Sequence, residues 1–379
     1  MNINEQSNIL ITCSRGVSPF LEKEAAALGF TPVSTHETGV VVRGTIKDTY
    51  RLNLELRTAL NVLFLLKEFR CTSPEVLYKE AGTVKWEDII PPAEYISVVS
   101  QVNNPTVNNT MFANQKFKDA VVDRMTNKTG KRPDSGPERS NIVINFYWND
   151  QKAWIYLNTS GTKLADRGYR KIPLLAPMRE TLASAVVQAT GYNGTCHFVN
   201  PMTGSGTLAI EAALIALGKA PGLLRSNFGL KHIKGFDETY WQELRKATLQ
   251  KASKKPEFKI IATDIRPEHV DAAQKNAKTC GVDHLIEFGV SDFSKTAVPP
   301  GKGIVLLNPE YGERMGDKIN LISVYKGIGD FFKKECSGYT GFVFTGNMDL
   351  AKKVGLRASQ RLPFFTAEIE CRLLRYDIY

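Results

Sequence analysis

The chain has 379 residues, enough for two or three domains, and its 42% hydrophobic and 23% charged residues are the balance of an ordinary globular protein. Lys and Arg number 49 and Asp and Glu 39, which gives a formal net charge of +10. This surplus favours a polyanionic partner, but a merely basic surface explains it equally well.

The cysteines and histidines argue against a metal site. The six cysteines are scattered without a CxxC pair, and the five histidines form no HExxH pattern, so we expect neither bound metal nor a disulfide framework. Residues 1–7 lack the features of a secretory signal, and the apolar run 62–66 is too short to cross a bilayer. We therefore expect a cytoplasmic protein with no membrane partner.

The first 160 or so residues have the pattern of a mixed α+β region. Their loop 129–137 is dense in Gly and Pro, and a second boundary falls near residues 160–161. Strands are expected at 9–12, 39–42, 96–102, 142–147 and 153–157, and helices at 19–28, 48–66 and 114–126.

After about residue 165 the pattern changes to strands alternating with helices, which predicts the α/β class with a doubly wound sheet. The strand 303–307 is almost continuously apolar, as is typical of a parallel sheet covered on both faces. The other strands are expected at 197–199, 260–262, 285–288, 341–345 and 367–374, and helices at 208–217 and 267–278.

The segment 200–207, NPMTGSGT, lies between an apolar strand and an apolar helix. Its glycines let the backbone approach a ligand closely, beyond the carboxyl ends of the strands. Asp264 ends the next strand, where a carboxylate can accept hydrogen bonds from both ribose hydroxyls. Asp292 ends the strand after that and can accept from an adenine amino group, with Phe293 beside the ring. The pattern indicates a nucleotide-like cofactor.

Two alternatives compete with this interpretation. The loop can be a structural turn, with both aspartates serving only as solvated caps. A nicotinamide-binding Rossmann fold also places an acid after its second strand. The segment that follows the fourth strand argues against the nicotinamide alternative.

Asn308 and Pro309 directly follow the apolar strand 303–307. An exocyclic amine of a nucleobase is a poor nucleophile, because its lone pair is delocalised into the ring. An Asn side-chain oxygen and a backbone carbonyl can hold its two N–H groups and orient the nitrogen for in-line attack on a sulfonium methyl. Tyr311 can stack on the base, and no strong general base is needed. The alternative is an Asn-Pro turn with a core Tyr.

The segment 308–311, NPEY, resembles the NPPY motif of amino-methyltransferases. Extended through Arg314, it resembles the NPPYGER of the bacterial large-subunit ribosomal RNA guanine-N2 methyltransferase family. Residues 200–213 resemble motif I of that family, and residues 167–170 and 176–183 resemble the start of its catalytic domain.

The N-terminal half is similar to the ferredoxin-like plus THUMP module of the same family, including residues 118–123 and 130–133. The resemblance thus covers nearly the whole chain. Proteins of this kind are often labelled N6-adenine-specific DNA methylases from the NPPY motif alone.

The resemblance implies an RNA methyltransferase that uses S-adenosyl-L-methionine and forms N2-methylguanosine in large-subunit rRNA. It implies a ferredoxin-like α+β segment at 1–60, a THUMP RNA-binding module at 61–163 and a Rossmann-like methyltransferase domain at 164–379. The alternatives are an N6-adenine DNA methyltransferase and a catalytically impaired RNA-binding or ribosome-assembly protein.

By this resemblance the catalytic roles fall on Asn308, Pro309 and Tyr311. The cofactor site comprises Asn200, Pro201, Thr203, Gly204, Ser205, Gly206, Asp264, Ile265, Asp292, Phe293 and Asn308. The residues expected to contact RNA, through its shape and phosphates, are Lys116, Lys118, Lys131, Arg132, Arg167 and Arg170.

Two residues depart from the family pattern. Asn200 replaces the usual acid at the start of motif I and so removes one negative charge. Glu310 replaces the second Pro of NPPY, which restores a backbone N–H and places a carboxylate beside the target base. That carboxylate can accept the guanine N1–H or point into solvent, and we expect the second.

Overall fold

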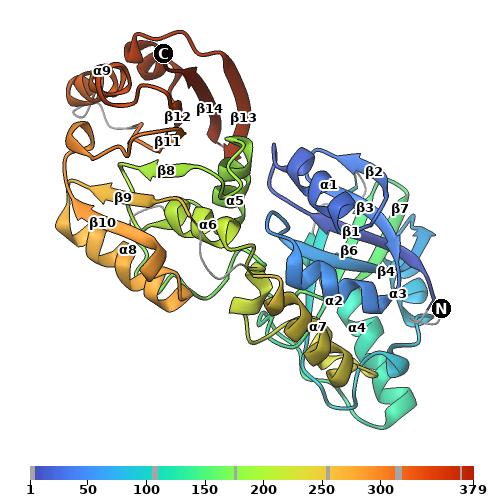
Figure 1. Cartoon of the computed structure of the whole chain (residues 1–379). Coiled ribbons are helices and arrows are strands. Elements are labelled where there is room, and N and C mark those ends of the chain that lie inside the picture. Colours follow the sequence, from blue (N-terminus) through green and yellow to red (C-terminus); the bar gives the residue numbers. More distant parts are fainter. Residues whose placement is uncertain (1–4, 105–109, 175–176, 253–256, 312–317, 368) are drawn as a thin grey trace. The chain divides into compact units, whose positions relative to one another are not determined.

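The computed structural model describes residues 5–104, 110–174, 177–252, 257–311, 318–367 and 369–379. Figure 1 shows the chain coloured along its sequence. It divides into two compact units, and neither is a continuous stretch of chain. The first comprises residues up to 13, 21–166 and 225–247, and the second comprises 14–20, 167–224 and 248–379.

The first unit contains a seven-stranded sheet in the order β2-β3-β1-β4-β7-β6-β5. Neighbouring strands are antiparallel except β5 and β6, which are parallel. The strands are β1 (Ser7–Thr12), β2 (Pro32–His36), β3 (Gly39–Gly44), β4 (Asn61–Arg70), β5 (Ile96–Asn103), β6 (Ile142–Asn149) and β7 (Lys152–Asn158). The helices are α1 (Ser18–Ala27), whose first three residues belong to the second unit, α2 (Ile46–Glu55), α3 (Pro74–Gly82) and α4 (Thr110–Thr129).

The two faces of this sheet differ in burial. Side chains such as Ile9 and Phe64 on one face are completely buried, and Phe146 on that face stacks against Phe117 of α4 at 4.7 Å between ring centroids. Their neighbours on the opposite face, including Leu10 and Leu65, are only partly buried. The hydrophobic core therefore lies on one side of the sheet.

The prediction of one helix over residues 48–66 was wrong. Helix α2 ends at Glu55, and Leu56 adopts an extended conformation with ψ of 130°. The apolar run 62–66 then forms part of β4, between β1 and β7 in the middle of the sheet. A central strand is as apolar as a buried helix, so hydrophobicity alone cannot distinguish them.

Residues 225–247 return to the first unit after the chain has entered the second. Arg225, which is 7% exposed, holds this segment against the end of segment 21–166 of the first unit. Its guanidinium donates to the carbonyl oxygens of Lys163 and Asp166 at 2.7 and 2.9 Å, and to Thr162 Oγ1 at 2.9 Å. The predicted boundary at residue 163 lies beside this attachment, but a single boundary cannot describe the returning segment.

We predict that Arg225→Met destabilises the first unit by about 1–3 kcal/mol, because the partly buried carbonyl oxygens that Arg225 bonds would lose charged donors. Urea denaturation of the full chain measures the change. The exposed Lys246→Met, which removes the same charge from the same segment, should leave the midpoint nearly unchanged. Equal midpoints for the two variants would contradict the structural role of Arg225.

The second unit contains a doubly wound sheet in the order β10-β9-β8-β11-β12-β14-β13. The first five strands are parallel, and β14 runs antiparallel to both β12 and β13. The strands are β8 (His197–Asn200), β9 (Ile260–Asp264), β10 (Ile286–Val290), β11 (Gly303–Leu307), β12 (Thr340–Thr345), β13 (Gln360–Thr366) and β14 (Ile369–Asp377). The main helices are α5 (Glu180–Ala189), α6 (Thr207–Ala216), α8 (Pro267–Cys280) and α9 (Lys318–Glu335), and α7 (Glu238–Gln250) begins in the first unit and ends here.

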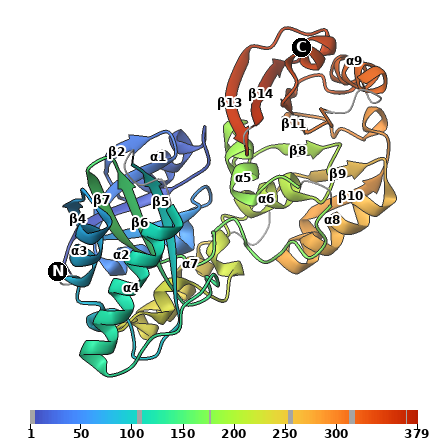
Figure 2. The same ribbon diagram turned by 180° about the vertical axis from the view of Figure 1, so that it is seen from behind.

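Figures 1 and 2 show these strands with their helices from opposite sides. The predicted parallel strands are confirmed, whereas the strand expected at 367–374 begins at Ile369 and follows an unpredicted strand, β13. Strand order reverses between β8 and β11, because the chain continues from β8 to β9 on one side and reaches β11 on the other. Ligands of doubly wound sheets bind beyond the carboxyl ends of the strands at such a reversal. The predicted cofactor and catalytic loops both begin there.

Candidate active site

The glycine loop after β8 is held to the end of β9 by two backbone donors. Thr203 N donates to Thr263 O at 2.9 Å, and Gly204 N donates to the Asp264 carboxylate at 2.9 Å. A side chain on Gly206, whose φ is +86°, would place its Cβ 2.9 Å from that of Ala273 on α8. A Cβ on Gly204 would meet no described atom within 4 Å. Gly206 therefore allows close packing against α8, and Gly204 borders open space.

Asp264 is already well supplied with hydrogen bonds. Its Oδ2 accepts from Gly204 N, and its Oδ1 accepts from Arg266 N at 3.1 Å and lies 3.1 Å from His269 Nδ1. Because a carboxylate has about four acceptor positions, these two backbone hydrogen bonds leave room for further donors. The ribose hydrogen bonds expected of Asp264 stay a prediction.

Asn200 links β8 to β11. The side chain is fully buried, and its Nδ2 donates to Leu306 O at 2.8 Å. Its Oδ1 is also buried and has no hydrogen-bond partner among the described residues. An Asp at this position could not donate to the carbonyl, so the departure from the family acid has a structural role here.

Asn308 presents a similar unpartnered oxygen after β11. Its Oδ1 is buried and accepts no hydrogen bond from the described part of the chain, and Pro309 beside it is buried. Thr203 Oγ1, in the glycine loop, is likewise buried without a partner in the described residues. A buried acceptor without a donor is costly, which is consistent with a ligand that supplies the missing hydrogen bonds.

Glu310 and Tyr311, the next two residues of the loop, have different surroundings. The side chain of Glu310 is 73% exposed and lies 3.6 Å from the Arg266 guanidinium, close to the solvent orientation that we expected. The ring of Tyr311 packs beside Gly346, where an added Cβ would lie 3.1 Å from Tyr311 Cε2. Asn347 Nδ2 donates to Tyr311 O at 3.4 Å. The rest of the NPEYGER segment, residues 312–314, lies outside the described residues, as does residue 176 of the start of the catalytic domain.

The residues expected around adenine follow β9 and β10. Ile265 is 62% exposed and offers an apolar surface directly after Asp264. Asp292 caps a 3-10 helix at Phe293–Lys295 by accepting from Ser294 N at 2.9 Å, and Ser294 contacts its Oδ1. Phe293 packs edge-on against Phe331 at 6.2 Å. These residues thus lie at the same edge of the sheet as the glycine loop.

The comparisons with known proteins agree with this geometry. The family model for the RMKL-like methyltransferase domain matches residues 167–375, which is more than half of the chain. The chain belongs to this methyltransferase family. Models of the RlmL ferredoxin-like domain and the THUMP domain match residues 8–63 and 71–158.

Two curated relatives of this chain differ in length. Ribosomal RNA large subunit methyltransferase K/L of Psychromonas ingrahamii is 36% identical over 97% of this chain but only 50% of that protein. The chain thus spans about half the length of the K/L relatives that it matches. A Synechocystis protein whose name proposes RNA methyltransferase activity is 30% identical over 97% of this chain and 96% of its own length.

Solved structures share the whole architecture. A protein of Clostridium difficile described as a possible methylase has a TM-score of 0.89 and 27% identity, with 98% of each chain covered. A Listeria monocytogenes protein described as a predicted N6-adenine-specific DNA methylase also has a TM-score of 0.89, with 26% identity over 99% of this chain and 97% of that one.

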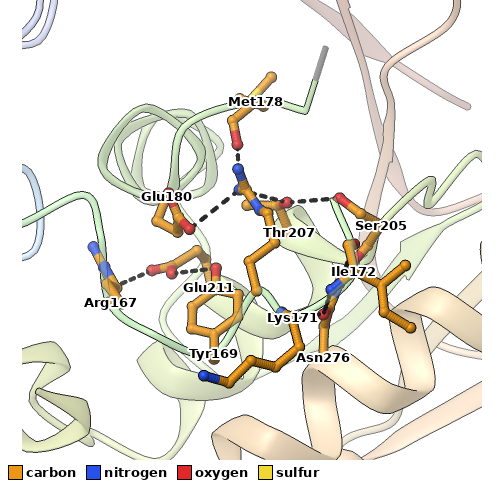
Figure 3. Close-up of polar contacts among 11 residues, drawn as sticks. Arg167, Tyr169, Lys171, Ile172, Met178, Glu180, Ser205, Thr207, Glu211 and Asn276 are labelled. Atoms are coloured by element: carbon orange, nitrogen blue, oxygen red, sulfur yellow. Dashed lines mark hydrogen bonds and ion pairs between the residues drawn. The ribbon is translucent and has the colours of Figure 1, made fainter. Parts of the chain in front are cut away.

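The residues expected to contact RNA fall into two groups. Lys131 and Arg132 are exposed, and Lys116 and Lys118 on α4 are partly exposed, so these four remain candidates. Arg167 is buried and held by acceptors inside the methyltransferase domain (Figure 3), which contradicts its predicted RNA contact, whereas Arg170 is partly exposed and its RNA contact stays a prediction.

Arg167 is 1% exposed, and its guanidinium pairs with the fully buried Glu211 of α6 at 2.6 Å. The hydroxyl of Tyr169 donates to the other oxygen of Glu211 at 3.0 Å. Burial raises the pKa of Tyr169 well above its usual value, so this hydroxyl remains a donor. The RGYR segment therefore anchors the helix that follows the glycine loop.

Arg170 and Asn276 extend this anchoring to both ends of the loop, where Figure 3 labels Thr207, Ser205 and Asn276. Arg170 donates to Met178 O at 2.6 Å and to Thr207 Oγ1 at 3.1 Å, and lies 3.4 Å from Glu180. Asn276 of α8 donates to Ser205 O at 3.0 Å. Burial raises the pKa of Glu180. Sequence reasoning missed Glu211 and Asn276. Each is a polar residue on the apolar face of a predicted helix, and that pattern is the signal that could have identified it.

Among the described residues, no group of three or more His, Cys, Asp and Glu side chains could hold a metal ion. No helix in the described parts of the chain combines the length and the apolar character that crossing a membrane requires.

We predict that Glu211→Leu destabilises the methyltransferase domain by about 3–5 kcal/mol, because it leaves the Arg167 charge buried without its partner. Arg167→Met combined with Glu211→Leu should recover most of the loss, since an apolar pair of similar volume can replace a buried ion pair. Scanning calorimetry compares the three proteins, with the exposed Glu335→Leu as a matched control. A double variant no more stable than Glu211→Leu would contradict this account.

Proposed function

We propose that the protein transfers a methyl group from S-adenosylmethionine to the exocyclic N2 of a guanine in large-subunit ribosomal RNA. The observation that carries the proposal is the buried Asn308 Oδ1 at the reversal of strand order, which has no hydrogen-bond partner among the described residues and lies two residues beyond the carbonyl that Asn200 bonds. Family membership supplies the reaction class. The residue chemistry supplies the kind of acceptor, an exocyclic amine, and the names of the relatives point to large-subunit ribosomal RNA.

The cofactor loops fit the proposed donor. Open space beside Gly204, an acceptor position on Asp264 and the exposed apolar Ile265 suit a polar chain, a ribose and a purine, respectively. The oxygens of Asn200 and Thr203, which accept no hydrogen bond within the described parts of the chain, are further acceptors in the same loop. When bound, S-adenosylmethionine supplies an electrophilic methyl group on a positively charged sulfur.

The catalytic loop would orient the amino group of the base. Asn308 Oδ1 and the Pro309 carbonyl accept hydrogen bonds from the two N–H groups of the base's amino group. This aims the nitrogen lone pair at the methyl carbon. Tyr311, supported by Gly346 and Asn347, stacks on the base after it leaves its helix. The proton leaves once the nitrogen has become cationic, so the site needs no strong base.

RNA as the polymer is supported by the relatives and by the matched THUMP domain. The K/L relatives are named for large-subunit ribosomal RNA, and the Synechocystis relative is named for RNA. A ribosomal substrate implies action in the cytoplasm. DNA methylation at adenine N6 is the second candidate, because the Listeria structure carries that description and adenine also presents an exocyclic amine.

Nucleoside mass spectrometry of rRNA from cells with and without the gene tests the proposal. We expect N2-methylguanosine at one position to disappear from large-subunit rRNA without the gene and to return when purified protein methylates that RNA. Methylation of DNA adenine with no label in RNA would replace the proposal with the second candidate. Cofactor binding without methylation of either polymer would favour an impaired RNA-binding protein.

We predict that Asn308→Ala lowers the transfer rate at saturating cofactor by roughly 100-fold, because the amine loses its orientation. Tyr311→Ala should also lower the rate, and both variants should bind S-adenosylmethionine almost as tightly as the parent, a pattern that marks positioning of the base. Glu310→Ala is the control within the same loop and should retain most of the rate. Parent-like turnover of Asn308→Ala would show that this loop is only structural.

A further inference from the structure

The first unit contains a hollow of about 590 Å³ on the face of its sheet that lies opposite the core. Its lining combines aromatic and polar residues with aliphatic ones, including Leu10, Val41 and Leu65. The lining residues on which the argument depends are Tyr147, Trp154, Tyr156, Gln101, Asn103 and Asn149. We call this the aromatic hollow.

Strand register places the aromatic residues together. Trp154 and Tyr156 are alternate residues of β7 and therefore share a face, and Tyr147 of β6 lies directly opposite Trp154. The rings of Tyr147 and Tyr156 are 5.5 Å apart at a 52° angle. Trp154 and Tyr147 are only partly buried, whereas side chains on the other face form the core. Aromatic area is thus accessible on a rigid, continuous sheet.

Several of the polar residues that line the hollow near these rings are neutral amides. Gln101 lies opposite Tyr147 on β5, and Asn103 lies opposite Asn149, to which its Nδ2 donates at 2.9 Å. Amides offer both donors and acceptors at fixed positions. Burial raises the pKa of Tyr147, so its hydroxyl stays protonated and can donate.

Charge on this face is arranged around the hollow. The described residues that line it include one carboxylate, Glu68, and no Lys or Arg. Arg70 and Lys152 lie opposite one another, two residues beyond Glu68 and Trp154 on the same face, and both are exposed. Arg43, also exposed, lies opposite Asn8 at another part of the hollow. Lys152 forms an ion pair with Glu68 at 3.5 Å, and the exposed Arg70 and Arg43 also lie at the border of the hollow.

This arrangement fits one ligand chemistry. Flat neutral rings stack on aromatic side chains, their edges bond amides, and the phosphates that join them contact basic residues at the border. A site for phosphates alone would have Lys or Arg in its floor. Duplex RNA presents its bases stacked inside the helix, where a sheet face cannot reach them.

We propose that the aromatic hollow binds unpaired nucleobases of the RNA substrate and so forms a second recognition site, separate from the loop that holds the methylated base. This inference rests on RNA being the substrate. It assigns to the sheet face, rather than to the basic helix α4 alone, a part in RNA recognition.

Fluorescence offers a direct test, because Trp154 is the accessible tryptophan of the four. Trp86 is 0% exposed, and Trp148 and Trp241 are 1% exposed. A single-stranded RNA of about ten nucleotides should protect the full-length protein from acrylamide quenching. The same RNA annealed to its complement should protect much less. Trp154→Phe should abolish the RNA-dependent change.

Affinity provides the second readout. Tyr147→Leu with Trp154→Leu should weaken single-strand binding about tenfold or more, since each stacked base contributes substantially. Melting temperature and S-adenosylmethionine affinity should stay near the parent values. Tyr78→Leu, at an aromatic residue that is 38% exposed outside the hollow, is the matched control.

The outcomes separate the two proposals. If the parent methylates RNA and the double variant binds the single strand with parent affinity, the hollow is not a recognition site and the proposed function stands. Equal protection of Trp154 by duplex and single strand also overturns the inference. A parent protein that binds no RNA in any form would overturn both.

Discussion

The hydrogen bond from Asn200 Nδ2 to Leu306 O is the interaction on which the candidate site depends. Backbone pairing between β8 and β11 extends only to Val199 and Val305, because the two strands then lead into different loops. The side-chain amide of Asn200 satisfies the next carbonyl of β11 where the ladder stops. It thereby fixes the start of the glycine loop against the strand that directly precedes Asn308. An acid, which is usual at this position in the family, cannot make this bond.

The positive charge is distributed unevenly between the two compact units. The first holds 23 Lys and Arg against 21 Asp and Glu, whereas the second holds 26 against 18. Most of the surplus therefore lies in the unit with the methyltransferase domain. Phosphate attraction and base recognition can then have different locations, with long-range attraction strongest at the catalytic unit and stacking on the aromatic sheet of the other. This division suits a substrate that combines paired and unpaired RNA.

Much of the fold and part of the site could be predicted because strand ends leave a local signal. An apolar run followed by Asp264 or Asn308 marks both a strand and the edge where it ends, and parallel pairing brings such edges together. Partners distant in sequence leave no such signal. Arg167 was predicted to face RNA because nothing near it in the chain reveals Glu211, 44 residues away. The same limit applies to residues 225–247, whose return to the first unit depends on the contacts of Arg225.

Asn200→Asp tests the central claim most directly, because it exchanges the donor for an acceptor with almost no change in shape. The measurement is methyl transfer to RNA at saturating S-adenosylmethionine, together with the dissociation constant of the cofactor. If the bond to Leu306 holds the two loops together, the variant should bind the cofactor more weakly and also transfer more slowly when cofactor is saturating. Transfer at the parent rate under saturation would contradict the account, since it would show that the catalytic loop does not depend on Asn200.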